Sequence, residues 1–185
     1  VNTSFLDSIS KSVLATSDGP IAVKLSAYSA FLKSKERAGI ERAVLTNTFA
    51  RNSFAQGVFE KFVSLVASQD LFMNEFLVLA TADDKEFLAQ TTKSPVVDRV
   101  TSLRKVALQG AAEESLDQDA VKWFDAATGR IDLLKQVDDY LAGQLTAKVT
   151  TEAESAQASL WAVLLGTLAL TVAVSTGCFL AIRSV

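Results

Sequence analysis

The sequence contains no histidine and a single cysteine, Cys178, among its 185 residues. These scarcities exclude disulfide bonds within the chain, cysteine-based zinc sites, Cys–His nucleophiles and acid–base catalysis by histidine. The carboxylates are not clustered at a spacing that suggests a metal site, and no glycine-rich loop is spaced to hold a phosphate. We therefore predict no catalytic residue, no metal and no cofactor, and we do not expect this segment to be an enzyme.

Proline and glycine are also scarce, with two and eight copies, which is too few for an all-β protein built on tight turns. Ala and Leu are the commonest residue types, and they favour helices, as do the Lys, Glu and Gln residues spread along the chain. The net charge is −3, and acidic and basic residues are mixed along the chain. Because no basic stripe exists, we expect no nucleic-acid partner. These features together predict an all-α protein.

Apolar residues recur at helical spacing in several segments separated by short breakers. Helices are predicted over residues 1–17, 21–51 and 58–80, and a fourth, weaker segment over residues 95–108. Ser94 is the expected N-cap of the segment that starts at Pro95, and Asp83-Asp84-Lys85 is typical of another helix start. The last helix begins near residues 116–119, with an apolar stripe from Phe124 onward. Such helices with short links indicate an antiparallel helical bundle with a long last helix.

Charged residues are absent from Leu160 to Ile182, a run of 23 positions, and roughly 20 apolar residues span a bilayer as a helix. Trp161 lies at one end of the run and Arg183 follows the other, as at membrane surfaces. A buried helix of a soluble core is the alternative. We predict that the last helix continues into one transmembrane helix over residues 157–183, with residues 1–156 forming an extracytoplasmic sensor domain. Residues 184–185 would begin a cytoplasmic region, and an earlier signal or transmembrane segment is expected before Val1.

The stretch Lys35-Glu36-Arg37-Ala38-Gly39-Ile40-Glu41-Arg42-Ala43 is densely charged with alternating sign. A solvated helix face with local salt bridges is one interpretation. At about 100° per residue, however, Arg42 lies beside the apolar stripe of this helix, whereas Arg37 points away from it. Gly39 is on the same side as Arg42, one turn earlier, and leaves space there. An arginine turned toward a bundle interior requires an anion, which is either a carboxylate or a ligand.

This charged stretch, with Ala27-Tyr28 before it and Phe49-Ala50 after it, resembles the second half of the NIT domain, the nitrate- and nitrite-sensing domain of bacterial receptors. The pattern Lys-Glu-x-Ala-Gly-x-Glu-Arg-Ala is the most specific part. The similarity covers roughly residues 20–150, and it continues through Phe62, Leu65, Gln69, Phe76, Ala80, Trp123-Phe124, Thr128-Gly129-Arg130-Ile131-Asp132, Leu134-Lys135 and Val137.

The resemblance implies a domain of two stacked helical bundles, in which an arginine from each half holds nitrate or nitrite. In this chain Arg42 would be the second-half arginine, with Arg37 as the alternative, and Gly39 would leave room for the ligand. Gln69 is either a polar neighbour of the site or a core amide. The first half, with its own arginine, is expected upstream of Val1.

The resemblance further implies a membrane signalling receptor in the cell membrane, and we expect a homodimer. Binding of nitrate or nitrite would be transmitted through the transmembrane helix to a cytoplasmic signalling domain in cis, such as a chemoreceptor rod, a kinase or a cyclase. The alternative is a structural or dimerising helical stalk with no small-anion ligand. Trp123 and Phe124 are expected to be core anchors, and Arg130 and Asp132 are expected to be surface charges.

Overall fold

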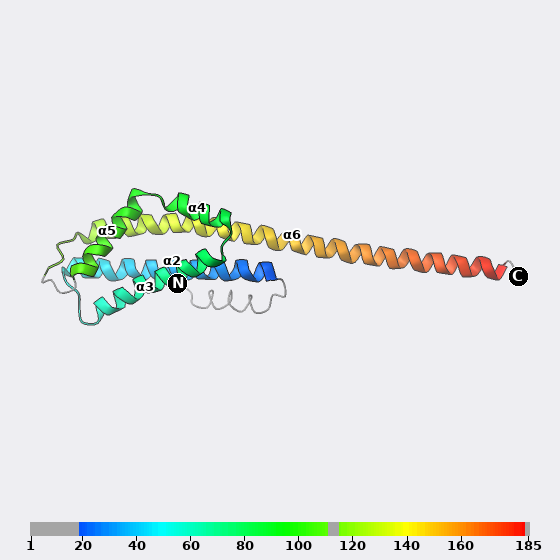
Figure 1. Ribbon diagram of the computed structural model, residues 1–185, viewed down its shortest axis with the longest axis horizontal. Helices are drawn as coiled ribbons and strands as arrows, with labels where there is room; N and C mark the ends of the chain where they lie inside the picture. The colour runs from blue at the N-terminus through cyan, green and yellow to red at the C-terminus, as the bar shows by residue number, and fades with distance from the viewer. Residues whose placement is uncertain (1–18, 111–114, 184–185) are drawn as a thin grey trace. The chain divides into compact units, whose positions relative to one another are not determined.

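The computed structural model describes residues 19–110 and 115–183, with side chains of the last helix up to residue 167 apart from residues 152–154 and 156. Every regular element in these residues is an α-helix (Figure 1). The all-α prediction is confirmed, and the helix predicted over residues 1–17 lies outside the described residues. The helices are α2 (Gly19–Arg51), α3 (Val58–Leu79), α4 (Ala82–Thr92), α5 (Pro95–Gln109) and α6 (Ala120–Arg183).

The chain divides into two compact units, residues 1–145 and residues 146–185. The first unit contains α2 to α5 and the part of α6 up to Leu145, and it forms the helical bundle. The second unit contains the rest of α6. In that unit the large apolar side chains between residues 160 and 165 are 57–65% exposed, namely Leu160, Trp161, Val163, Leu164 and Leu165.

The two short helices begin at capping residues that the sequence makes recognisable. Ser94 caps α5 by accepting a hydrogen bond from the Val96 backbone N–H, and Pro95 occupies the first turn, as predicted. Thr81 caps α4, and Asp84 completes a capping box by accepting from the Thr81 backbone N–H at 3.1 Å. The acidic pair that marked a helix start therefore lies within the first turn of α4.

Asn52 directly follows the last residue of α2 and forms hydrogen bonds with the segment that leads into α6. Its backbone is in the left-handed region, with φ 58°, which asparagine tolerates better than most residues. Its side-chain Oδ1 accepts hydrogen bonds from the backbone N–H groups of Leu116 at 3.0 Å and Asp117 at 2.7 Å. The end of α2 is thereby held beside the start of α6.

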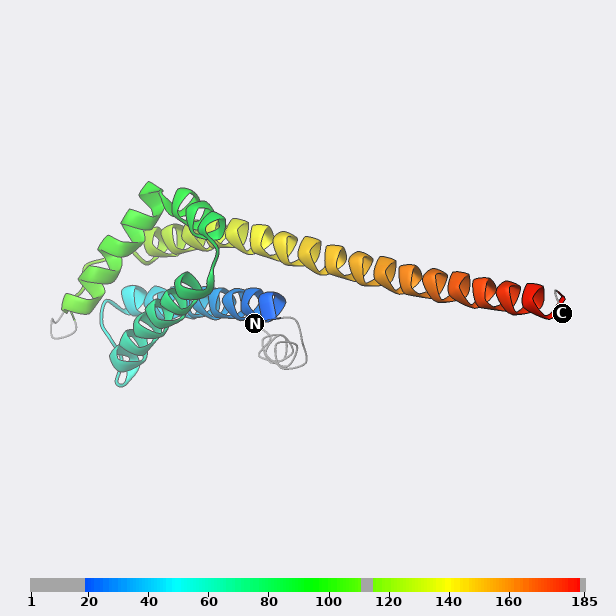
Figure 2. The ribbon, with the colours of Figure 1, turned by 45° about the vertical axis from the view of Figure 1, so that its right-hand side comes forward.

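Contacts between α2 and α6 run in opposite order along the two helices, which shows that they are antiparallel. Tyr28 near the start of α2 donates to Asp138 of α6 at 2.7 Å. Phe49 near its end packs edge-on against Trp123, with ring centroids 5.8 Å apart. Figures 1 and 2 both show the two helices running side by side within the bundle. The predicted antiparallel bundle is confirmed.

The core of the bundle consists of two apolar clusters, which we call core cluster A and core cluster B. Both combine residues from α2, α3 and α6, whereas α4 contributes to A and α5 to B. The most deeply buried large side chains of cluster A include Phe31, Phe76, Leu134 and Val137. Those of cluster B include Leu45, Phe62, Val100 and Trp123.

One described helix is long and apolar enough to be a candidate membrane span, and it is α3 rather than the C-terminal part of α6. The face of α3 that carries Phe62, Leu65 and Phe76 is buried in the bundle, and core helices of globular domains meet the same criterion. The side chains of residues 168–185 lie outside the description. The transmembrane helix over residues 157–183 therefore stays a prediction.

Candidate functional site

A layer of four polar side chains lies in the bundle, and we call it the polar layer: Glu41, Gln69, Arg104 and Arg130. Each comes from a different helix, namely α2, α3, α5 and α6 in that order. Glu41 and Gln69 are each 1% exposed. Burial of such groups is costly unless they are hydrogen-bonded, so their partners decide what the layer does.

Glu41 is the centre of the polar layer. Arg104 donates to both of its carboxylate oxygens, from Nε at 2.7 Å and from Nη2 at 2.6 Å. This paired arrangement is the strongest geometry for a guanidinium and a carboxylate. Gln69 donates from Nε2 to the same carboxylate at 2.8 Å. The Glu41 carboxylate of α2 thus accepts hydrogen bonds from side chains of α3 and α5, and it links the three helices.

Arg130 is held less tightly than Arg104. Its Nη1 donates to Gln69 Oε1 at 3.1 Å, and it is 3.7 Å from the nearer oxygen of Glu41. Burial and, to a smaller extent, the neighbouring positive charge of Arg104 together lower the pKa of Arg130 to about 10, against the opposing effect of Glu41. Arg130 is therefore a buried cation whose charge is incompletely balanced.

Local packing brings α5 and α6 together near Arg130. A Cβ added to Gly129 would lie 3.1 Å from the Val96 side chain, so the absence of a side chain allows the two helices to approach closely at this point. Gln69 is fixed from the other side, because its backbone carbonyl accepts a hydrogen bond from the buried hydroxyl of Ser34 at 3.0 Å. The layer is therefore positioned by helix packing as well as by its own hydrogen bonds.

Arg42, the residue that the sequence favours for a ligand, lies on α2 next to Glu41 but outside the polar layer. Its Nη1 donates to the Thr128 hydroxyl at 3.0 Å, and its guanidinium carbon is 4.9 Å from the centre of the Phe124 ring. Such stacking of a cation on an aromatic face is favourable. Arg42 forms no ion pair with any carboxylate among the described residues. Its backbone carbonyl accepts from Trp123 Nε1 at 3.0 Å.

The other predicted site residues do not gather around Arg42. Arg37 pairs with Glu36 at 3.3 Å, with a third of its side chain exposed. Gln69 belongs to the polar layer, where it contacts two other arginines. Gly39 faces open space, since a Cβ added there would meet no atom within 4 Å. The ligand-binding roles of Arg42, Arg37, Gly39 and Gln69 stay predictions.

Two expectations about individual side chains are wrong. Arg130 is not a surface charge, because its side chain is 16% exposed and contacts Gln69. Phe124 is not a core anchor, because it is 42% exposed, whereas its neighbour Trp123 is fully buried as expected. The buried stripe of α6 begins at Trp123, and Arg130 lies one heptad after it and one before the buried Val137. That spacing is the signal that identifies Arg130 as a core position.

Arg104 and Glu41 also occupy core positions that the sequence interpretation missed. Arg104 lies one residue after the buried Leu103 and three before the buried Ala107. Glu41 lies three residues after Ala38 and four before Leu45, which are both buried. A polar residue in register with an apolar stripe is the pattern that would have found them.

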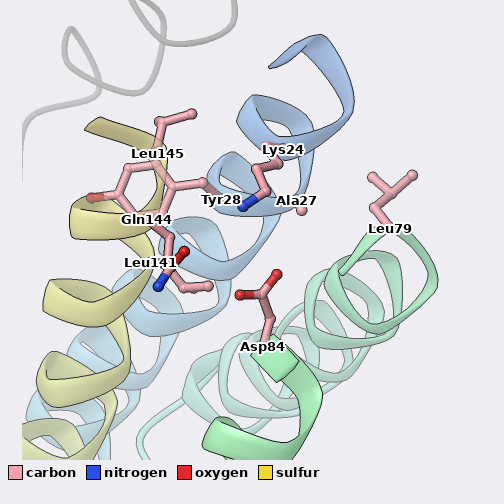
Figure 3. A pocket seen from close by; sticks show the side chains of 8 residues that line it. All are labelled: Lys24, Ala27, Tyr28, Leu79, Asp84, Leu141, Gln144 and Leu145. Carbon is pink, nitrogen blue, oxygen red and sulfur yellow. The ribbon is translucent and has the colours of Figure 1, made fainter. Parts of the chain in front are cut away.

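Hollows among the described residues of the bundle include the following pair. Figure 3 shows the smaller one, of about 20 Å³, where Lys24 and Tyr28 of α2 lie near Asp84 of α4, and its volume suits about one water molecule. A more open groove of about 330 Å³ between the end of α2 and the start of α3 contains Arg51 and Lys61. None of the predicted ligand residues lines either hollow. No group of three or more cysteine or acidic side chains that could hold a metal ion occurs among the described residues.

Comparison with known proteins identifies relatives of the chain. A family model described as nitrate and nitrite sensing matches residues 1–146. A nitrate regulatory protein from Klebsiella oxytoca is 28% identical over 145 residues, which cover 77% of this chain and 36% of that protein. The chain thus spans about a third of the length of this relative. No solved structure matches it significantly.

Proposed function

Because this chain belongs to the nitrate- and nitrite-sensing (NIT) family, we propose that its bundle binds nitrate or nitrite through Arg42 and passes the binding event to a signalling output. The observation that carries the proposal is the state of Arg42. Its guanidinium lies on the Phe124 ring and forms no ion pair with a carboxylate among the described residues.

The chemistry of the ligand matches this environment. Nitrate is planar and singly charged, and its oxygens accept hydrogen bonds in one plane. A guanidinium is also planar and offers paired N–H donors in a fork, whereas the ammonium of lysine is a point charge. In Arg42 one nitrogen is held by Thr128, which fixes the plane of the group and leaves other donors for the anion. Partial burial strengthens the attraction, because the effective dielectric constant is lower than in water.

The competing interpretation is an internal ion pair, in which Arg42 serves a carboxylate of the bundle. The two adjacent carboxylates are already engaged elsewhere, since Glu41 pairs with Arg104 and Glu36 contacts Arg37. This distribution supports a ligand role for Arg42. In our proposal, a second arginine from the other half of the NIT domain completes the site in the whole protein, as the family resemblance implies.

Replacing Arg42 by lysine in the full-length protein is expected to weaken nitrate binding by about 1.5–3 kcal/mol, the worth of a charged hydrogen bond, or roughly 10–150-fold in Kd. The charge remains but the fork is lost. Calorimetric titration with nitrate measures the change. The melting temperature without nitrate is expected to stay nearly constant.

Arg37→Lys is the matched control, because Arg37 lies on the same helix and carries the same charge but contacts Glu36. It is expected to leave the nitrate affinity unchanged. Parental affinity in the Arg42→Lys protein together with a large loss in the Arg37→Lys protein would transfer the role to Arg37. If neither arginine matters and no nitrate binds, the chain is a structural or dimerising stalk.

We also propose that the protein is a homodimeric membrane receptor, anchored by residues 157–183 and linked to a cytoplasmic signalling domain. The exposed apolar side chains from Leu160 to Leu165 support a lipid environment for this part of α6. The bundle would then lie outside the cytoplasm, and α6 would carry the change in the bundle toward the membrane.

Single cysteines introduced at Ser155 and Ser184, in a protein whose Cys178 is replaced by alanine, test this topology in intact cells. A membrane-impermeant thiol reagent is expected to label position 155 and to leave position 184 unlabelled until the cells are opened. The reverse pattern, or equal labelling of both positions in intact cells, would rule out the proposed orientation.

A further inference from the structure

The polar layer contains more positive than negative charge. Within contact distance there are two guanidinium groups, of Arg104 and Arg130, and one carboxylate, of Glu41. Asp70 attracts Arg130 from a longer distance and is itself exposed. A buried excess charge is unfavourable unless a counterion approaches it. The layer therefore has an electrostatic reason to attract one more negative charge.

Hydrogen-bond donors are available for such a charge. Arg104 uses Nε and Nη2 on Glu41 and Gln69, and Arg130 uses Nη1 on Gln69. The Nη1 group of Arg104 and the Nε and Nη2 groups of Arg130 donate to no described residue. These two side chains are each 16% exposed, whereas that of Glu41 is 1% exposed. Solvent thus reaches part of each arginine side chain but almost none of the carboxylate.

We propose that Arg104 and Arg130 form an anion-binding site of their own, distinct from Arg42, which takes one small, singly charged oxyanion such as nitrate or nitrite. Guanidinium groups bind planar oxyanions through paired donors. A single negative charge brings the layer of two cations and one carboxylate to neutrality. A doubly charged anion would leave it negative beside the buried Glu41, so the site discriminates by charge.

The site does not depend on ligand binding at Arg42, although the two lie close together on the same helices. Glu41 and Arg42 are consecutive on α2, and their partners Arg130 and Thr128 are two residues apart on α6. An anion in the polar layer would therefore affect the contact between α2 and α6 in which Arg42 also takes part. The affinity of the anion for the polar layer and its effect on nitrate binding at Arg42 can be measured separately.

The test uses the full-length protein and nitrate as the probe, with sodium gluconate keeping the ionic strength constant. In the Arg42→Gln protein, calorimetry is expected to detect a remaining nitrate site that weakens about tenfold or more when Arg130→Gln is added, the scale of a lost charged hydrogen bond. Sulfate is expected to bind this site less tightly than nitrate. Lys135→Gln is the control, because Lys135 is an exposed cation of α6 that pairs with Asp139.

Stability in gluconate gives the second readout. Arg130→Gln leaves the pair of Glu41 and Arg104 intact, so the variant is expected to fold and to melt within a few degrees of the parent. If Arg130→Gln fails to fold, or keeps the remaining nitrate affinity, Arg130 is a structural counterion of Glu41 and the second site does not exist. Loss of all nitrate binding by Arg42→Gln alone also overturns the second site, whereas unchanged binding in that variant contradicts the role proposed for Arg42.

Discussion

Replacement of Glu41 by glutamine is expected to lower the free energy of unfolding by about 3–5 kcal/mol, the cost of breaking a buried ion pair by removing one partner. The substitution keeps the size of the side chain but removes the carboxylate to which Arg104 donates twice. Two buried guanidinium groups are then left without their counterion. Urea denaturation of the parent and the variant measures the difference.

Two further variants separate this effect from general damage to α2. Glu36→Gln removes a carboxylate of the same helix whose partner Arg37 is one-third exposed, and it is expected to cost under about 1 kcal/mol. Adding Arg130→Gln to Glu41→Gln is expected to restore part of the loss, because one of the two unbalanced charges disappears. A Glu41→Gln protein as stable as the Glu36→Gln protein would show that solvent already screens the polar layer.

Trp123→Ala is expected to destabilise the bundle by a similar amount, about 3–5 kcal/mol, which is the usual cost of removing a large buried aromatic side chain. Trp123 is fully buried and packs against Phe49 in core cluster B. Its truncation leaves a cavity where α2, α5 and α6 meet. Thermal and urea unfolding of the variant measure the loss.

The adjacent aromatic residue supplies the control for this variant. Phe124→Ala removes a side chain that is 42% exposed and is expected to cost clearly less than Trp123→Ala. Trp123→Phe fills most of the space but loses the Nε1 donor to the Arg42 carbonyl. That carbonyl also accepts from the Thr46 hydroxyl at 2.6 Å, so most of the stability is expected to remain. Equal losses for Trp123→Ala and Phe124→Ala would contradict the burial of Trp123.

The helices could be predicted from the sequence because their signals are local. Apolar periodicity and breakers placed α2, α3 and α5 within two residues of their observed ends. Ser94 and Pro95 marked the start of α5, because an N-cap and a first-turn proline affect only the adjacent turn of the helix. Asp84 marked the start of α4 for the same reason, through its bond to the Thr81 backbone.

The buried charges could not be found by the same means, because their partners are distant in the chain. Glu41 and Arg104 are 63 positions apart, and no local rule says which helices face each other. The stripe of α6 was also started at Phe124, whereas its first buried residue is Trp123. A start at Trp123 places Arg130, seven residues and about two turns later, on the buried face.

The polar layer also determines which movements the bundle permits. Sliding α6 along α2 by one turn, about 5.4 Å, would move Arg130 away from Glu41 and bring the apolar side chain of Leu134 or Ala127 in its place. This displacement, like any smaller one, would face the charge of Glu41 with hydrocarbon and is costly. The polar layer is therefore expected to hold the register of α6 against α2 until its side chains exchange partners together. A sensor of this construction would switch between discrete arrangements, and partial ligand occupancy would change how many molecules have switched rather than how far each has moved.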